Sequence, residues 1–261
     1  MRRLVTALAL RVSIVSHATP PLLLEECAQT EAENVPSVAF EPRMPGYRLG
    51  DCISFCKCFF TKPFPDSIGA EYSSCCGEGD AFGCRSNYTQ IFQSLRKRDG
   101  RPGFERPEAD ALVIHLRLGD KIEKANQHQR NTALTHGFEE KLVSHGKHLT
   151  PSSIKGIPEL LKDARASGAS HVYIVAGTHQ RFAEGGGKLS YVYMQCAKRA
   201  LEGEGYRVTM RVGGDPDIDF YFMARARKFV VSAGGYSRHL GNLVRMQGGE
   251  LVGRTFGETA Y

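Results

Sequence analysis

The chain has 261 residues, which is enough for one large domain or two modest ones. A hydrophobic content of 41% and a charged content of 24% are those of a soluble globular protein and exclude a disordered or fibrous chain. The net charge of +6 suits an anionic small ligand such as a nucleotide, and also weak attraction to membranes or nucleic acid. Nucleic acid is not the leading interpretation, because the densest basic run extends only from Arg96 to Arg98 and is followed by Asp99.

The N-terminus is typical of a targeting segment. Two arginines precede an apolar stretch at residues 4–10, and after Arg11 a second apolar stretch ends in small residues near residue 18. This order predicts a secretory signal or anchor-like segment over residues 1–24 and a location in the Golgi or endoplasmic reticulum lumen, with or without a membrane anchor. A mitochondrial transit peptide is an alternative, since no acidic residue precedes Glu25, and an ordinary disordered N-terminus is another.

The cysteines are concentrated in one part of the chain. Seven of the eight lie between residues 27 and 84, and Cys196 stands apart. This concentration predicts disulfides in an oxidising compartment, and a glycosylation sequon that begins at Asn87 agrees with secretion. Zinc binding is the alternative, although no histidine lies among the closely spaced cysteines, which are Cys56, Cys58, Cys75 and Cys76. We therefore expect residues 25–107 to form a cysteine-rich N-terminal part.

Residues 19–45 are rich in proline and predict a tail or linker with one short strand at residues 38–40. A turn that contains Gly50 then leads into an apolar helix, for which Asp51 is a good N-cap. The backbone N–H groups of such a turn can bind an anion. A tight turn without a ligand is the simpler interpretation.

The strongest chemical signal lies between residues 111 and 120. An apolar run predicts a buried strand at residues 112–116, which contains His115 and is followed by Arg117 and Asp120. Ligands of open α/β sheets bind at the carboxyl ends of the strands, where these side chains would lie. The alternative is a structural ion pair between Arg117 and Asp120.

From this strand onward, apolar runs alternate with helical patterns. Strands are predicted at residues 112–116, 171–176, 206–212, 229–232 and 251–252. Helices are predicted between them, one with Pro158 at its head and Gly168 at its end, and others at about residues 189–201, at about residues 219–227 and from near Ser237. The lengths suit right-handed βαβ units, so we expect residues 108–261 to form a Rossmann-like α/β domain with a parallel sheet.

Every predicted strand-to-helix turn then carries glycine beside polar groups on one sheet edge. After the turn of Arg117 come those that hold Thr178 and His179, Asp217 and Asp219, and finally Ser232, Gly234, Gly235 and Ser237. Such an edge suits a nucleotide: arginine offers a fork for phosphate, the last helix offers N–H groups with Ser237 at its cap, and an aspartate can accept from a ribose or a base. The alternative is that loop ends are polar in any protein. Neither of the two common glycine-rich phosphate-binding motifs occurs.

Three segments resemble the fucosyltransferase superfamily that has the H-x-R-R-x-D box and the GT-B fold. Residues 113–120 resemble that box, residues 219–237 resemble a later acidic, apolar and serine-rich box, and residues 46–51 resemble an early glycine loop. The resemblance implies a GT-B-like fold in which the N-terminal α/β part is reduced. It also implies an inverting transfer of sugar, first of all fucose from GDP-fucose, to a glycan or protein hydroxyl, without a bound metal or other cofactor.

The resemblance also assigns roles. Arg117 would bind the diphosphate, the turn from Ser232 to Ser237 would bind phosphate, and the acidic residue before it would contact the guanosine. A base that deprotonates the acceptor would be Asp120 or His115.

Other functions stay open. Leu118 occupies the position of the second arginine of the box, and the N-terminal part is short, which fits a catalytically inactive relative that binds glycan or protein. A cysteine-rich secreted binding module fused to an unrelated α/β domain is a further alternative, and it would keep its disulfides within residues 27–84. Other α/β enzymes, such as sulfotransferases, complete the alternatives.

Overall fold

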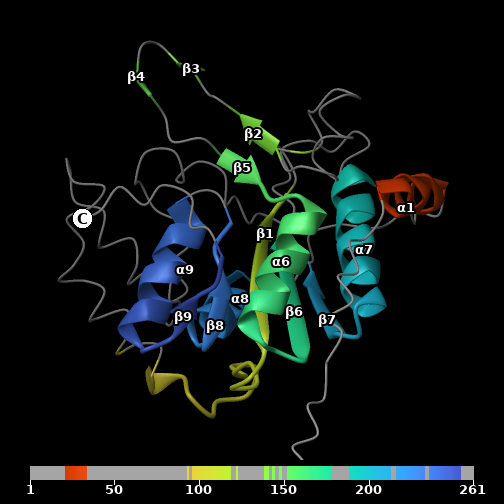
Figure 1. The fold of residues 1–261 in the computed structure, drawn as a ribbon. Coiled ribbons are helices and arrows are strands. Elements are labelled where there is room, and N and C mark those ends of the chain that lie inside the picture. Colours follow the sequence, from red (N-terminus) through yellow and green to blue (C-terminus); the bar gives the residue numbers. More distant parts are fainter. Residues whose placement is uncertain are drawn as a thin grey trace, which may run out of the picture.

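The computed structural model describes residues 21–33, 96–118, 152–177, 188–212, 216–232 and 235–253, together with residues 93 and 122 and short strands between 138 and 148. Its centre is a five-stranded parallel sheet with the order β7-β6-β1-β8-β9 (Figure 1). The strands are β1 (Leu112–Arg117), β6 (His171–Gly177), β7 (Arg207–Val212), β8 (Lys228–Val230) and β9 (Glu250–Leu251). The predicted α/β fold with a parallel sheet is confirmed.

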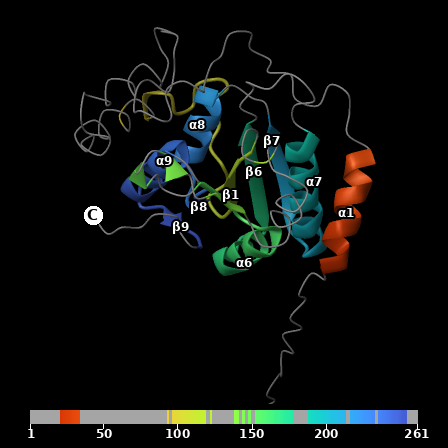
Figure 2. The ribbon, with the colours of Figure 1, turned by 90° about the horizontal axis from the view of Figure 1, so that it is seen from above.

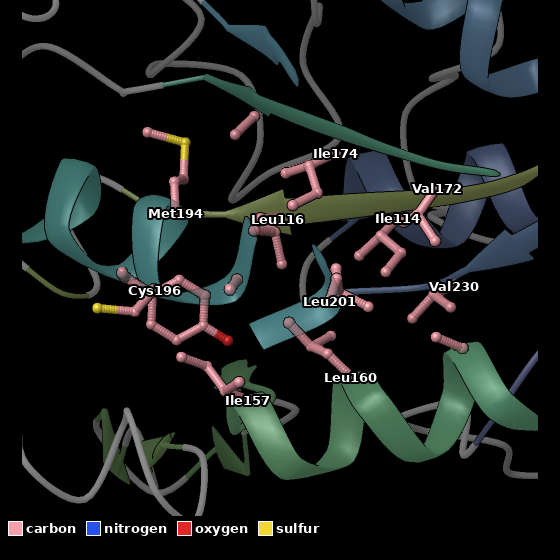
Figure 3. Close-up of a cluster of buried hydrophobic side chains, with 14 of the residues drawn as sticks. Ile114, Leu116, Ile157, Leu160, Val172, Ile174, Met194, Cys196, Leu201 and Val230 are labelled. Carbon is pink, nitrogen blue, oxygen red and sulfur yellow. The ribbon is translucent and has the colours of Figure 1, made fainter. Parts of the chain in front are cut away.

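Helices cover both faces of the sheet (Figure 2). On one face lie α6 (Ile157–Ser167) and α7 (Lys188–Gly203), and on the other lie α8 (Pro216–Ala224) and α9 (Gly235–Met246). Alternation along β1 explains the two cores, because Leu112 and Ile114 pack toward α6 and α7 while Val113 packs toward α8 and α9. The side chains between the sheet and the α6–α7 layer are shown in Figure 3.

Helix α6 shows how local sequence sets an element. Pro158 lies in its first turn, and the helix ends at Gly168, whose φ of 61° is the left-handed conformation that glycine adopts readily. The N–H of Gly168 donates to the carbonyl of Arg165, which closes the last turn. Both predicted ends of this helix are confirmed.

Several predicted boundaries are wrong. Helix α8 begins and ends three residues earlier than expected, because Pro216 fixes a helical φ at its start and tight turns at Arg225 and Ala226 lead straight into β8. Helix α9 begins at Gly235, so Ser237 lies inside the helix and is not its cap. Strand β8 ends at Val230, which leaves Ser232 beyond the strand, and the other strands and α7 shift by one or two residues.

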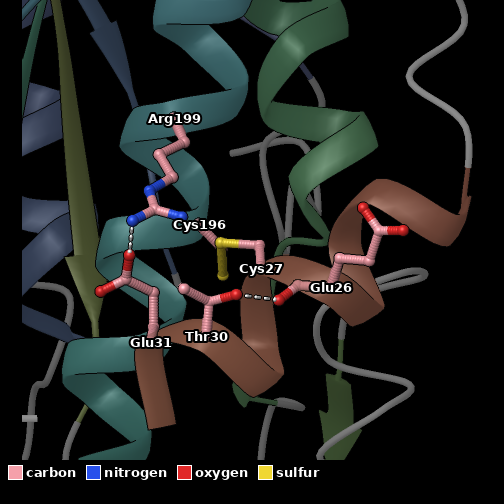
Figure 4. Close-up of a disulfide and its surroundings, with 6 residues drawn as sticks. All are labelled: Glu26, Cys27, Thr30, Glu31, Cys196 and Arg199. Carbon is pink, nitrogen blue, oxygen red and sulfur yellow. Dashed lines mark hydrogen bonds and ion pairs between the residues drawn. A yellow bond between two sulfur atoms is a disulfide. The ribbon is translucent and has the colours of Figure 1, made fainter. Parts of the chain in front are cut away.

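The expected tail or linker contains a helix, α1 (Pro21–Glu33), which packs on α7. Cys27 of α1 forms a disulfide with Cys196 of α7, with the two Cα atoms 5.7 Å apart (Figure 4). The nearly buried carboxylate of Glu31 pairs with Arg199 beside it. Cys27 is therefore joined to the α/β domain. A disulfide set confined to residues 27–84, as a separate cysteine-rich module would have, is wrong for this cysteine. Tertiary packing on α7 stabilises a helix for which local sequence gave no signal.

The segment between β1 and α6 also differs from expectation. No element was predicted there, but it holds two short antiparallel pairs, in which β2 (Phe138–Glu140) joins β5 (Ser152–Ile154) and β3 (Val143–Ser144) joins β4 (Lys147–His148). The strand predicted at residues 38–40, the helix after Asp51 and the closely spaced cysteines proposed for zinc lie outside the described residues.

Candidate functional site

The structure describes the side chains of five predicted site residues, which are His115, Arg117, Asp219, Ser232 and Ser237. Asp217 and Gly235 lie in the first turns of α8 and α9, where only the backbone is described. The remaining predicted site residues lie outside the described residues; they are Gly50, Asp120, Thr178, His179 and Gly234.

The order of the strands places the candidate site between β1 and β8. The chain passes from β1 outward to β6 and β7, and then returns to the other side of β1 to form β8 and β9. In open α/β sheets, ligands bind at the carboxyl ends of the strands where the strand order reverses. His115 and Arg117 end β1 at this point, and Ser232 lies two residues after β8.

Two hydrogen bonds connect β1, the loop after β8 and α9 at the carboxyl ends of the strands. The backbone N–H of Ser232 donates to Oγ of Ser237, at 2.8 Å, and Oγ of Ser232 lies 2.8 Å from Nδ1 of His115. Ser237 is fully buried, Ser232 is nearly so and His115 is half-buried. These hydrogen bonds therefore fix the loop after β8 against both β1 and α9.

Arg117 lies beside these hydrogen-bonded residues. It is the last residue of β1 and follows His115 by two positions, so both side chains project from the same face of the sheet. Its Nε atom is buried and has no hydrogen-bond partner among the described residues. A buried N–H donor without an acceptor costs about 1–3 kcal/mol, and an anion that accepts from it removes that cost.

Asp219 has a different environment from the one expected. It is nearly buried in α8, and its carboxylate lies 3.4 Å from Nε of Arg211, at the carboxyl end of β7. Arg211 also stacks over the ring of Phe222, with its guanidinium carbon 4.2 Å from the ring centre. The carboxylate therefore has a cation of the protein beside it, two strands away from β1.

Polar clusters that the sequence did not indicate lie at the opposite, amino end of the sheet. His171 at the start of β6 contacts Glu108 through Nδ1 and Thr209 through Nε2, each at 2.9 Å, and Arg207 donates to the same carboxylate at 2.5 Å. The hydrogen bond from His171 lowers the pKa of Glu108. These residues are up to 99 positions apart, and no local motif joins them.

A second cluster at the amino end surrounds Asp99. Its carboxylate accepts from Tyr221 and pairs with Arg106 and Arg225. Burial lowers the pKa of Arg225, whose side chain is 10% exposed. This cluster fixes the loop before β1 to the end of α8.

No group of three or more histidine, cysteine, aspartate or glutamate side chains is placed to hold a metal ion in the part of the chain that the structure describes. In that same part, no helix combines the length and apolar character needed to cross a membrane.

Comparisons with known proteins give only distant similarity. No family model and no curated protein sequence matches the chain. Crystal structures of POFUT1 match it with TM-scores of 0.32 in complex with GDP, and of 0.32 and 0.34 in two crystal forms in complex with GDP-fucose. Sequence identities are 12%, 15% and 11%, over 59%, 60% and 62% of this chain but only 44%, 43% and 46% of those chains. The chain thus spans less than half the length of these structures, and similarity this low supports no conclusion about activity or substrate.

Proposed function

We propose that the carboxyl ends of β1 and β8 bind the diphosphate of a nucleotide sugar, and that the protein is a glycosyltransferase. The reaction we propose is the transfer of fucose from GDP-fucose to a glycan or protein hydroxyl with inversion. The observation that carries the proposal is Arg117, whose Nε is a buried donor without an acceptor among the described residues, located where the strand order reverses.

The chemistry of glycosyl transfer fits such a donor. The bond to the leaving diphosphate breaks with oxocarbenium character, so negative charge builds up on the departing phosphate oxygens. A guanidinium offers them two parallel hydrogen bonds in a fixed fork, and it stays charged at any physiological pH. In this proposal Arg117 holds the diphosphate, and Ser232 contributes a hydroxyl beside it.

The rest of the donor would occupy the neighbouring turns. We assign the remaining contacts with the nucleotide to the first turn of α8, to residues beside β6 and α9, and to the early glycine turn, namely Asp217, Asp219, Thr178, His179, Gly234, Gly235 and Gly50. Asp120 is the proposed base for the acceptor hydroxyl. We place the protein in the lumen of the secretory pathway, and the disulfide between Cys27 and Cys196 supports an oxidising compartment.

A second candidate is a relative that binds the nucleotide sugar or a glycan without turnover. Leu118 favours it: the side chain at the position of the second arginine is apolar and completely buried in the core. Arg117 would then bind the diphosphate without the help of a second arginine.

Calorimetric titration of the full, oxidised chain with GDP and GDP-fucose tests the proposal, together with an assay for GDP release in the presence of glycan acceptors. Binding of both nucleotides with release of GDP is the expected result. Binding without release in any acceptor mixture would favour the second candidate. A protein that binds neither nucleotide would overturn the glycosyltransferase and leave only the glycan-binding form of the second candidate.

A further inference from the structure

We infer that His115 is a positioning residue, which turns the hydroxyl of Ser232 into a hydrogen-bond donor for the anion. The inference rests on the proposed function, because it concerns how the same site recognises a diphosphate. It assigns His115 a role other than that of a base, and it specifies which hydrogen of Ser232 reaches the ligand.

The first step concerns the donors that Ser232 possesses. A serine has two hydrogens available for bonding, one on the backbone nitrogen and one on the hydroxyl. The backbone N–H already donates to Oγ of Ser237, in a position that is completely buried. The hydroxyl hydrogen is therefore the only donor with which Ser232 can bind an anion.

The second step concerns the direction of the bond between Ser232 and His115. The distance of 2.8 Å between Oγ and Nδ1 fits a bond in either direction. If the hydroxyl donates to Nδ1, its hydrogen is occupied and the oxygen presents only lone pairs, which repel a phosphate. If Nδ1–H donates to the hydroxyl oxygen, the hydroxyl hydrogen is released for the ligand.

An anion that binds beside Ser232 therefore selects the form of His115 that carries hydrogen on Nδ1. Hydrogen bonds then run in one direction, from the His115 ring to the Ser232 hydroxyl and from that hydroxyl to a phosphate oxygen. Donation to the hydroxyl oxygen also polarises its hydrogen and strengthens the bond to the anion. Arg117, which projects from the same face of β1, provides the charge beside it.

Replacement of His115 by residues with and without a donor tests this inference. The amide nitrogen of His115→Asn can take the place of Nδ1–H, and we expect affinity for GDP and for inorganic pyrophosphate within about threefold of the wild type. His115→Leu cannot donate and should weaken both by roughly tenfold, the equivalent of one hydrogen bond. Ser232→Ala should weaken them to the same extent, and combining it with His115→Leu should add nothing.

A matched control exists at the other end of the sheet. Thr209→Val removes a hydroxyl that contacts a histidine, His171, at a similar distance of 2.9 Å. Thr209 is exposed and valine suits a strand, so the fold should tolerate the change. We expect affinity for GDP and pyrophosphate to be unchanged, and thermal unfolding and circular dichroism of every variant check that it is folded.

Nitrogen-15 NMR of the His115 ring measures whether Nδ1 carries hydrogen, which a merely structural role of His115 would not determine. With GDP bound, we expect Nδ1 to be protonated. An acceptor Nδ1 in the complex, or additive losses in the double variant, would overturn this inference while leaving the nucleotide site intact. Failure of the wild type to bind either GDP or pyrophosphate would instead overturn the site and this inference together.

Discussion

The polar side chains at the two ends of the sheet differ in their partners. At the amino end, Asp99 and Glu108 are each paired with arginine, and a histidine or tyrosine completes each cluster. At the carboxyl end, two serines and His115 are joined by hydrogen bonds beside Arg117, whose Nε has no partner among the described residues. The amino end holds loops in place, whereas the carboxyl end leaves a buried guanidinium nitrogen without an acceptor among the described residues.

Arg225 makes this comparison sharper. Its Nε is also buried without a hydrogen-bond partner among the described residues, so an unpartnered nitrogen alone does not identify a site. However, its terminal nitrogens bond Asp99 and Gln247, which neutralise and orient the guanidinium. What distinguishes Arg117 is its position where the strand order reverses, together with His115 two residues before it, whose ring contacts the hydroxyl of Ser232.

The largest effect on stability is expected at the amino end. Asp99→Ala leaves the mostly buried guanidinium of Arg225 without its counter-charge, and removing one partner of such a pair should lower the free energy of unfolding by about 3 kcal/mol. Urea unfolding followed by circular dichroism measures the change. Asp99→Ala combined with Arg225→Met should recover much of the loss. An altered affinity for GDP in folded Asp99→Ala would contradict the independence of the two ends.

A smaller effect on stability, accompanied by an effect on binding, is expected from Ser237→Ala. The buried N–H of Ser232 loses its acceptor, which should cost about 1–2 kcal/mol of unfolding free energy, and the loop after β8 loses its anchor on α9. Urea unfolding and GDP titration measure the two effects.

Ser167→Ala is the matched control for Ser237→Ala. Ser167 is a buried serine whose hydroxyl accepts from Ala169 at the end of α6. Ser167→Ala should lower the free energy of unfolding by a similar amount and leave the affinity for GDP unchanged. An equal loss of affinity in both variants would mean that Ser237 acts through stability alone.

The smallest effect concerns acid stability at the amino end. The hydrogen bond from His171 lowers the pKa of Glu108 below its ordinary value of 4.5. The folded state therefore favours the carboxylate, and the stabilisation is present above pH 4.5 and is lost as the pH falls through the lowered pKa. Glu108→Gln should reduce the acid-side decline of the melting temperature. A decline identical to that of the wild type would show that this exposed carboxylate makes no measurable contribution.

The sequence predicted the layers of the fold because the buried strands are short apolar runs and because α6, α7 and α9 each have one apolar face. Local signals also placed both ends of α6, where Pro158 and Gly168 act within single turns. They misplaced the start of α9, since the glycines before Ser237 suggested a loop although Gly235 is helical. Helix ends depend on tertiary contacts as well as on local residues, which is why these boundaries were wrong.

Long-range pairing could not be predicted. His115 and Ser232 were each expected at a strand end, but their bond joins residues 117 positions apart and requires that β1 and β8 be neighbours, which the sequence does not specify. The disulfide between Cys27 and Cys196 spans 169 positions, and the connectivity of eight cysteines cannot be deduced from their spacing. The helix that carries Cys27 is likewise fixed by its packing on α7.

The most direct test of the account compares two arginines of the same sheet. Arg117→Ala and Arg207→Ala each remove one positive charge, the first at the carboxyl end of β1 and the second at the amino end of β7. Calorimetric titration with GDP should show affinity reduced by about 10- to 100-fold in Arg117→Ala, as the loss of a charge-assisted hydrogen bond predicts, and affinity unchanged in Arg207→Ala. Equal affinities in the two variants would contradict a diphosphate site at Arg117.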